Sequence, residues 1–381
     1  MAIMNSNVLN DMTQCCGCGV CENVCKTGAI TMTETKDGFL YPVIDSGKCV
    51  NCKSCVNHCP VAIHDKLKID THNVACYAGY ITDDEKLSGS ASGGAATAIA
   101  EYILSEGGVV FGVAYSDAYT KAVTVKVSTV EELNNIRDSK YMQSNKGQIY
   151  KEVKQALDAG QKVLYTGTPC EIGAVKAFLN KSYDNLFTCE IICHGTTTYK
   201  VVEQYIRQQE KEHNSRLVKM SVRSKDNGWR VPHIKLQFEN GDVLLEKFYE
   251  TNYGKAFAVY LRESCYKCLY KGKGKVADIT VGDFWGATKN DEYWNANGIS
   301  SVMVHSEKGQ ELIDNIKGLK LFDVEYTTIL AANKTLEHSE PRDKVTGLLK
   351  FNFCHMGLKK AIGIHSVYRK VIGGIKGMIR R

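Results

Sequence analysis

The chain has 381 residues, 44% of them hydrophobic and 24% charged, a composition typical of a globular protein with two or three domains and not of a disordered one. Its net charge of +6 is concentrated at one end, because residues 342–381 carry +9 and the rest of the chain carries −3. We therefore expect no nucleic-acid partner for the body of the protein.

The N-terminal residues, MAIMNSNVLNDM, lack the basic stretch and the apolar run of a signal peptide. No run of 18 apolar residues predicts a membrane span. Because disulfides are rare in reducing compartments, the 16 cysteines are expected to be thiols, most of them holding metal. These features together favour a cytoplasmic protein.

Two cysteine runs between residues 15 and 60 share the spacing C-x2-C-x2-C-x3-C, and a proline follows the second run. This is the pattern of bacterial two-cluster ferredoxins, in which the fourth cysteine of each run binds the other run's cluster. We therefore assign two [4Fe-4S] clusters. The first set of ligands is Cys15, Cys18, Cys21 and Cys59, and the second is Cys49, Cys52, Cys55 and Cys25. A pair of zinc sites is the alternative.

A polar linker follows this module, and residues 76–81 then predict a strand. The next stretch, Ser88-Gly-Ser-Ala-Ser-Gly-Gly-Ala95, runs directly into a predicted helix that ends at Gly107-Gly108. A Ser/Gly-rich loop before a helix favours anion binding, because free backbone N–H groups and the helix dipole meet there. A simple helix cap at Ser92 is the equally open alternative.

Strands and helices alternate from residue 109 to residue 213, which predicts an α/β domain with a largely parallel sheet. Two of its strands lead into the sequences GTPC, ending at Cys170, and CHG, beginning at Cys193. Ligands collect at the carboxyl ends of such strands. Asn240-Gly241 then predicts an antiparallel hairpin. The fold class is therefore α/β (α+β overall), a ferredoxin-like module fused to an α/β domain with an added hairpin.

A further C-x2-C pair, Cys265 and Cys268, supplies two of the four thiolates that a cubane needs. Cys170 and Cys193 are the other candidates, so these four cysteines predict a third [4Fe-4S] cluster. A structural zinc on the same ligands and a redox dithiol at the C-x2-C pair remain open. The other cysteines are expected to be buried or incidental, namely Cys16, Cys76, Cys189 and Cys354.

The motifs SGSASGG, KYMQS, GTPC, ICHG, C-x2-C and ADITVGDFWG occur here in the order seen in the family of coenzyme F420 hydrogenase/dehydrogenase beta subunits, which residues 10–290 resemble. The resemblance implies a flavoprotein oxidoreductase that binds FAD on the Ser/Gly-rich loop and the KYMQS patch, next to a cubane. The cofactor-binding residues expected on this basis are Ser90, Ser92, Gly93, Gly94, Lys140, Tyr141, Gln143, Ser144 and Thr168.

Electron counting then predicts the reaction. Cubanes carry single electrons whereas a deazaflavin exchanges a hydride, so a flavin belongs between them. Electrons would pass from a donor such as ferredoxin through the clusters to FAD, and from there to coenzyme F420 or another small organic substrate. His194 and Lys140 are the candidate catalytic residues, although hydrogen bonding to a cluster is the simpler role for His194. The alternative is an electron-transfer subunit without its own substrate site.

Two further segments carry weaker expectations. Lys225 and Trp229 could contact a substrate, but a solvated hairpin loop is the simpler expectation for them. Asp283 and Trp285 fit either the site or the core. The expected domains are residues 1–64 (ferredoxin), 72–340 (flavin and third cluster) and 341–381 (basic tail). Apolar residues from Tyr368 to Ile379 share one face of a helix in that tail, which could contact a membrane surface or an acidic partner, or simply aid solubility.

Overall fold

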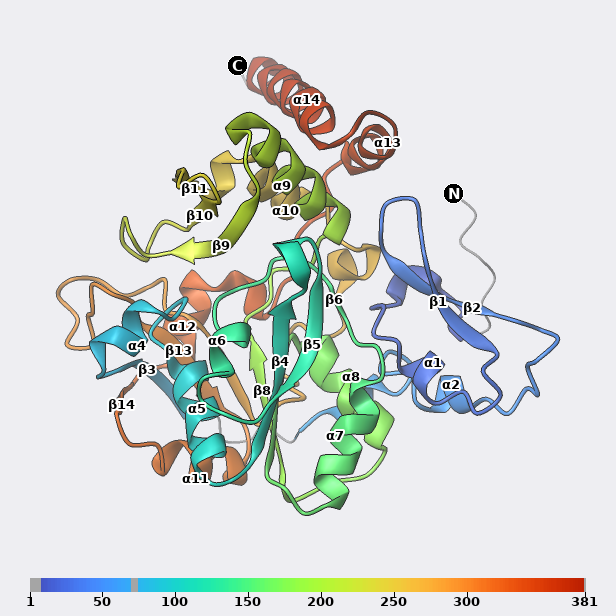
Figure 1. The fold of residues 1–381 in the computed structure, drawn as a ribbon, viewed down its shortest axis with the longest axis vertical. Coiled ribbons are helices and arrows are strands. Elements are labelled where there is room, and N and C mark those ends of the chain that lie inside the picture. The colour runs from blue at the N-terminus through green and yellow to red at the C-terminus, as the bar shows by residue number, and fades with distance from the viewer. Residues whose placement is uncertain (1–7, 70–74, 380–381) are drawn as a thin grey trace.

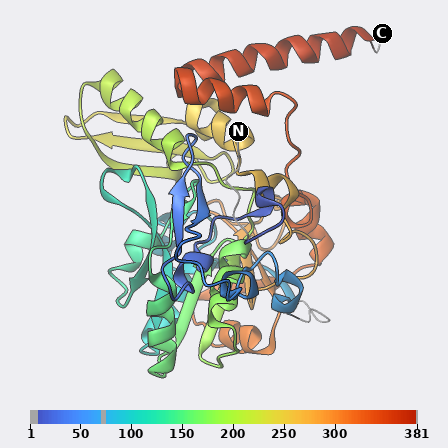
Figure 2. The same cartoon turned by 90° about the vertical axis from the view of Figure 1, so that its right-hand side faces the viewer.

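The computed structural model describes residues 8–69 and 75–379, with side chains as far as Arg369. A small N-terminal module lies beside a large mixed sheet, and a second, smaller sheet with the last helices lies above the large one (Figure 1). Seen from the side, α14 (Leu358–Ile379) extends beyond the body (Figure 2). Within the part of the chain that the structure describes, no helix is long and apolar enough to cross a membrane.

The N-terminal module is built from a hairpin and short helices. Its strands β1 (Ile30–Glu34) and β2 (Leu40–Ile44) pair antiparallel, with Ile30 opposite Ile44. Its helices are α1 (Val20–Asn23), α2 (Ser54–Asn57) and α3 (His64–Leu67). Each cysteine run begins in the loop that enters α1 or α2, has its third cysteine inside that helix and its fourth just after it. This confirms the expected ferredoxin-like module at the N-terminus.

The large sheet has nine strands, in the order β14-β3-β13-β12-β8-β7-β4-β5-β6. Pairing is parallel in β12–β8–β7–β4 and in β5–β6, and antiparallel elsewhere. The expected largely parallel sheet is therefore corrected to a mixed one. The bounds are β3 (Ala75–Ile81), β4 (Val109–Tyr115), β5 (Ala122–Val127), β6 (Ser144–Asn145), β7 (Val163–Gly167), β8 (Leu186–Ile191), β12 (Ile279–Asp283), β13 (Ser300–Val304) and β14 (Leu319–Asp323).

Helices cover both faces of this sheet. Phe111 and Tyr165 pack with α7 (Ile149–Asp158) and α8 (Pro169–Leu179), whereas their neighbours Val110 and Leu164 pack with α5 (Ala95–Ser105) and α11 (Glu307–Asp314). Strands buried on both faces need apolar residues at successive positions, which explains sequences such as VVFGV. The shorter helices are α4 (Asp84–Ser88), α6 (Leu133–Ile136) and α12 (Tyr326–Ala332).

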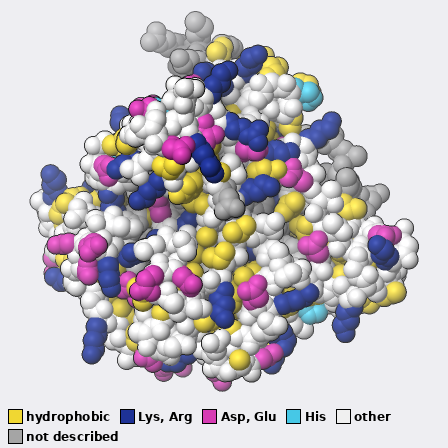
Figure 3. Space-filling model, in the orientation of Figure 1, with side chains coloured by type: hydrophobic (Ala, Val, Ile, Leu, Met, Phe, Trp, Pro, Cys, Tyr) yellow, Lys and Arg dark blue, Asp and Glu magenta, His cyan; other side chains and the backbone are white. Residues whose placement is uncertain are grey.

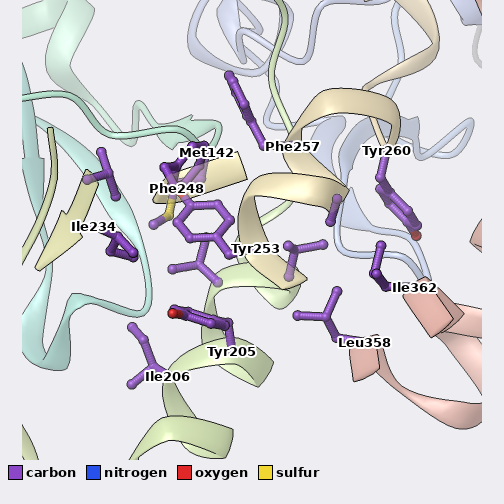
Figure 4. Close-up of a cluster of buried hydrophobic side chains, with 14 of the residues drawn as sticks. Met142, Tyr205, Ile206, Ile234, Phe248, Tyr253, Phe257, Tyr260, Leu358 and Ile362 are labelled. Atoms are coloured by element: carbon purple, nitrogen blue, oxygen red, sulfur yellow. The ribbon is translucent and has the colours of Figure 1, made fainter. Parts of the chain in front are cut away.

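The second sheet, β11-β10-β9, contains the expected hairpin. Its strands are β9 (Leu217–Ser224), β10 (His233–Phe238) and β11 (Val243–Lys247), and its helices are α9 (Tyr199–His213), α10 (Asn252–Val259), α13 (Thr346–Met356) and the start of α14. Tyr205, Phe248 and Tyr253 form the centre of a buried cluster that Leu358 and Ile362 complete (Figure 4). The basic segment therefore begins as part of the core, and its residues from 370 onward have no described side chains.

Candidate functional site

Four cysteines converge at the inner side of the N-terminal module. Cys15, Cys18, Cys21 and Cys59 line one small cavity, which Met32 and Pro42 close. Burial raises the pKa of Cys21, and the nearby Cys15 and Cys59 thiols raise it further. The structure thus brings together the four thiols that the crossed ferredoxin pattern assigns to one cluster.

The second set lies farther out. Burial raises the pKa of Cys55, and Cys52 and Cys25 add to this effect, so these three thiols are neighbours. Cys49 and Cys52 are exposed, as is the whole loop from residue 45 to residue 53. We call the two sets the inner and outer ferredoxin sites.

A third set converges from three parts of the body. Cys170 opens α8, Cys193 follows β8, and Cys265 and Cys268 lie in and just after the 3-10 helix Glu263–Lys267. Burial raises the pKa of Cys193 well above its usual value, and the other three thiols all contribute. Burial also raises the pKa of Cys265 to about 12 and that of Cys268 to about 11.

The thiols of each set are neighbours, but they are not close enough together to coordinate one metal ion. Over residues 8–69 and 75–379, no three His, Cys, Asp or Glu side chains form a group that could hold one metal ion. Because burial raises the pKa of the thiols of the third set, loading that site with iron would release protons.

Cys16 is a thiol whose position the sequence analysis missed. It makes a side-chain hydrogen bond with Cys170, and this bond together with burial raises the pKa of Cys170. It therefore touches both the inner ferredoxin loop and the third cysteine set. In the sequence, Cys16 was marked only by standing next to Cys15. The C-x2-C-x2-C-x3-C spacing makes Cys15 the ligand and assigns no role to Cys16.

A large cavity of about 820 Å³ lies beside the third cysteine set. Volumes of this order are typical of cofactor pockets. Predicted residues from four separate segments line it. They are Ser90, Ser92, Gly94, Lys140, Tyr141, Gln143, Ser144, Thr168, Cys170, Cys193 and His194. Gly93 is the one predicted cofactor residue outside this lining. On the face seen in Figure 3, hydrophobic side chains gather near the middle and charges of both signs surround them.

The first turn of α5 borders the cavity, and its N-cap residue has no side chain that could cap it. Gly94 is the N-cap, with a φ of 84°, and makes no side-chain cap hydrogen bond. Ser92 is not the cap: its Oγ donates to Ile299 O at 2.8 Å. Gly93 fits tightly, because a Cβ there would lie 2.3 Å from Gly79 O. Ala95 N donates to Ser300 Oγ at 3.4 Å, so among the described residues the backbone N–H groups of Ala96 and Thr97 are the ones left available for an anion.

Two cationic side chains lie at the same end of the cavity. Burial lowers the pKa of Lys140 to about 8, and its Nζ donates to the carbonyl oxygens of Arg137 and Asp138. Among the described residues, Arg137 Nε and Nη2 have no hydrogen-bond partner, and Glu101 lies 4.0 Å from Nη2. Arg137 was missed because it lies just outside the KYMQS motif.

Ser144 and Thr168 are tied into a buried polar network. Ser144 Oγ donates to Glu171 Oε1 at 2.8 Å, and Thr168 N donates to Glu171 Oε2 at 2.8 Å. Lys146, another residue that the sequence analysis missed, pairs with Glu171 and donates to Ser144. Burial opposes ionisation of Glu171, but Lys146 outweighs it and lowers the pKa. This network therefore shapes the cavity wall.

Tyr141, Gln143 and His194 have distinct surroundings. Tyr141 stacks on Phe257, with ring centroids 4.5 Å apart. Gln143 is turned to the ferredoxin module, where its Nε2 donates to Cys16 O at 2.9 Å. Burial lowers the pKa of His194, whose Nδ1 lies 3.2 Å from Glu340 Oε1. Its Nε2 is buried and, among the described residues, has no partner.

The loop after β9 differs from expectation. Trp229 is 3% exposed and stacks on Trp285 at 5.6 Å, and Lys225 Nζ donates to Ser92 O at 2.7 Å. The solvated loop predicted for these residues is therefore wrong, because the adjacent ends of β9 and β12 bring it against the Ser/Gly-rich loop. Asp283 forms a two-armed ion pair with Arg223 at 2.8 and 2.9 Å, and like Trp285 it borders the cavity.

Comparisons with known proteins match this architecture in three parts. A 4Fe-4S dicluster domain matches residues 14–63. The N-terminal part of the coenzyme F420 hydrogenase/dehydrogenase beta subunit matches residues 76–148, and its C-terminal part matches residues 160–328.

Individual relatives come from methane-producing archaea. A subunit of the F(420)H(2) dehydrogenase of Methanosarcina mazei is 23% identical over 80% of this chain and 82% of its own length. The coenzyme F420-dependent sulfite reductase of Methanocaldococcus jannaschii is 23% identical over 84% of this chain but only 49% of its own length. A chain of the F420-reducing NiFe hydrogenase complex from Methanosarcina barkeri is 21% identical, with a TM-score of 0.49, and the match covers 75% of this chain and 92% of that one.

Proposed function

Because the chain belongs to the family of coenzyme F420 hydrogenase/dehydrogenase beta subunits and is an iron–sulfur electron-transfer oxidoreductase of that family, we propose that it connects one-electron carriers to a hydride acceptor through bound FAD. The donor would be a ferredoxin-type protein, and the acceptor coenzyme F420 or another small organic molecule. The observation that carries the proposal is the convergence of one cavity, one uncapped helix and the third cysteine set.

The residues of the cavity fit an FAD diphosphate. The free N–H groups of the first turn of α5, the guanidinium of Arg137 and the ammonium of Lys140 supply donors and positive charge at one end. When bound, the flavin supplies the conversion between single electrons and a hydride. Tyr141 and Phe257 form an aromatic wall that excludes water.

The third cysteine set fits a [4Fe-4S] cluster by the chemistry of its donors. Cys170, Cys193, Cys265 and Cys268 are four partly buried neighbouring thiols next to the cavity. Lys271 Nζ donates to Cys193 O and so fixes the backbone at one ligand. His194 is the candidate proton-transfer residue: Glu340 holds the ring through Nδ1, so Nε2 of the neutral ring accepts a proton and can donate it again from the charged ring.

A second candidate function follows from the relatives. One relative is named as part of a dehydrogenase of several subunits, and the chain spans about half of the sulfite reductase. In this alternative the chain passes electrons onward and the substrate site lies on a partner. Anaerobic reduction by ferredoxin separates the two: if a small molecule such as F420 reoxidises the isolated chain, the chain has its own substrate site, and if none does, the subunit role holds.

Cofactor content tests the proposal directly. We expect about twelve irons, as three cubanes require, and one FAD per chain after anaerobic purification. Cys265→Ser should remove about four irons and leave the ferredoxin signals unchanged. Cys354→Ser is the matched control and should retain all the iron. About eight irons in the unaltered chain, with zinc bound, would instead show that the third cysteine set holds zinc.

A further inference from the structure

Arg262 is a buried cation to which neither the family nor the proposed function assigns a role. Its side chain is 1% exposed and is the largest of the fully buried side chains. Among the described residues it makes no ion pair. The carboxylate next to it in the chain, Glu263, pairs with Lys350 instead, at 2.7 Å. A buried guanidinium without a counter-anion is costly, so something must compensate its charge.

The Arg262 guanidinium lies between the loop that carries Cys15, strand β2 and Gln143. Nε donates to Cys15 O at 2.7 Å, Nη2 donates to Leu40 O at 2.7 Å, and Nη1 donates to Gln143 Oε1 at 2.9 Å. Nη2 also lies 3.8 Å from Cys15 Sγ. The oxygen acceptors are neutral, so among the described hydrogen-bond partners the Cys15 sulfur is the one that becomes an anion on binding iron.

Two aromatic rings and a glycine pack closely around the guanidinium. The Tyr41 ring stacks against the guanidinium at 4.2 Å, and Phe39 closes a second side at 5.5 Å. A Cβ at Gly17 would lie 2.5 Å from Nη1, so only glycine lets the cysteine loop pass this close. Arg262 is therefore built into the inner ferredoxin site, whereas the outer site faces water.

We propose that Arg262 is the fixed counter-charge of the inner [4Fe-4S] cluster and raises its reduction potential. Four thiolates give a cluster a net negative charge, and reduction adds one more. Burial opposes that added charge, and a cation at 3.8 Å favours it. Arg262 thereby keeps the inner cluster reducible by the outer one, each transfer oxidising the outer cluster and reducing the inner cluster by one electron.

The inference rests on the proposed ligation of the inner cluster by Cys15, Cys18, Cys21 and Cys59. An anaerobic potentiometric titration followed by electron paramagnetic resonance tests it. Arg262→Gln should lower the inner cluster's midpoint potential by at least about 59 mV, a tenfold change in the reduced-to-oxidised ratio, lower that of the third cluster by less, because its proposed ligand Cys265 is also near the guanidinium, and leave the outer one in place. Arg262→Lys, which retains the charge, should shift the inner midpoint less. Arg207→Gln, an exposed arginine on α9, is the control and should shift none.

A second pair of variants avoids truncating the buried side chain. Tyr41→Glu places a carboxylate beside the guanidinium and should lower the same midpoint, whereas Tyr41→Gln is its uncharged match and should not. Cys18→Ser shows which midpoint is the inner one, because that signal disappears. If Cys18→Ser removes no signal, the ligation is wrong. If Arg262→Gln or Tyr41→Glu retains its iron with unchanged midpoints, Arg262 is only a structural support and the inference fails.

Discussion

At the scale of single residues, Lys140 shows how burial changes the chemistry of an ordinary side chain. Its surroundings lower the pKa to about 8, and Asp138 only partly offsets this effect. The ammonium is therefore protonated below about pH 8 and neutral above it. A cation that titrates so close to neutrality makes anion binding in the cavity depend on pH.

The affinity for FAD should follow this titration. The protonated Lys140 attracts the diphosphate, so the affinity should fall as the pH rises through 8, and Lys140→Gln should remove that dependence. The variant should also bind FAD about 10- to 100-fold more weakly at neutral pH, the range for a charge-assisted hydrogen bond. Fluorescence titration of the deflavinated protein measures both effects. Lys151→Gln, an exposed lysine on α7, is the control, and a pH-independent wild-type affinity would contradict the assignment.

At the scale of elements, the loop before α5 is fixed by the close approach of backbone to backbone. A Cβ at Gly93 would lie 2.3 Å from Gly79 O in β3 and 2.4 Å from Ser300 N in β13. Neither atom can move without disturbing the pairing of β3 with β13, in which Gly79 lies opposite Ser300. The tight fit therefore holds the first turn of α5 at the cavity.

Gly93→Ala should displace this loop. We expect the free energy of unfolding to fall by about 1–3 kcal/mol, as in other overpacked sites, together with a loss of bound FAD. Anaerobic urea denaturation and flavin release measure the two effects. Gly347→Ala in α13 is the matched control, because no atom lies within 4 Å of its added Cβ. If Gly93→Ala behaves like this control, the loop does not position the helix.

At the scale of the whole molecule, the ferredoxin module is held against the body by buried hydrogen bonds as well as by Arg262. Tyr150 Oη donates to Cys18 O and Tyr270 Oη donates to Pro60 O, both at 2.8 Å. Both tyrosines come from the body and end next to inner-site cysteines. Docking of the module therefore also protects the inner site from solvent.

Tyr270→Phe should loosen this docking. It removes one hydrogen bond of about 1 kcal/mol and leaves the buried Pro60 carbonyl unpaired. The inner cluster should then be lost faster in the presence of a chelator, as measured by the decay of visible absorbance. Tyr183→Phe is the control, because its hydroxyl donates to Asp158 away from the module. Equal decay rates in the two variants would show that docking does not protect the cluster.

The sequence by itself determined the ferredoxin module, the main strands and helices and the loop before α5, because each depends on spacing over a few residues. The tertiary structure alone decided which distant residues meet. The contact of Cys16 with Cys170, the position of Arg262 at Cys15 and the burial of Trp229 all depend on strand order and on docking of the module. Such contacts join residues far apart in the chain, and no short-range pattern of residue types records them.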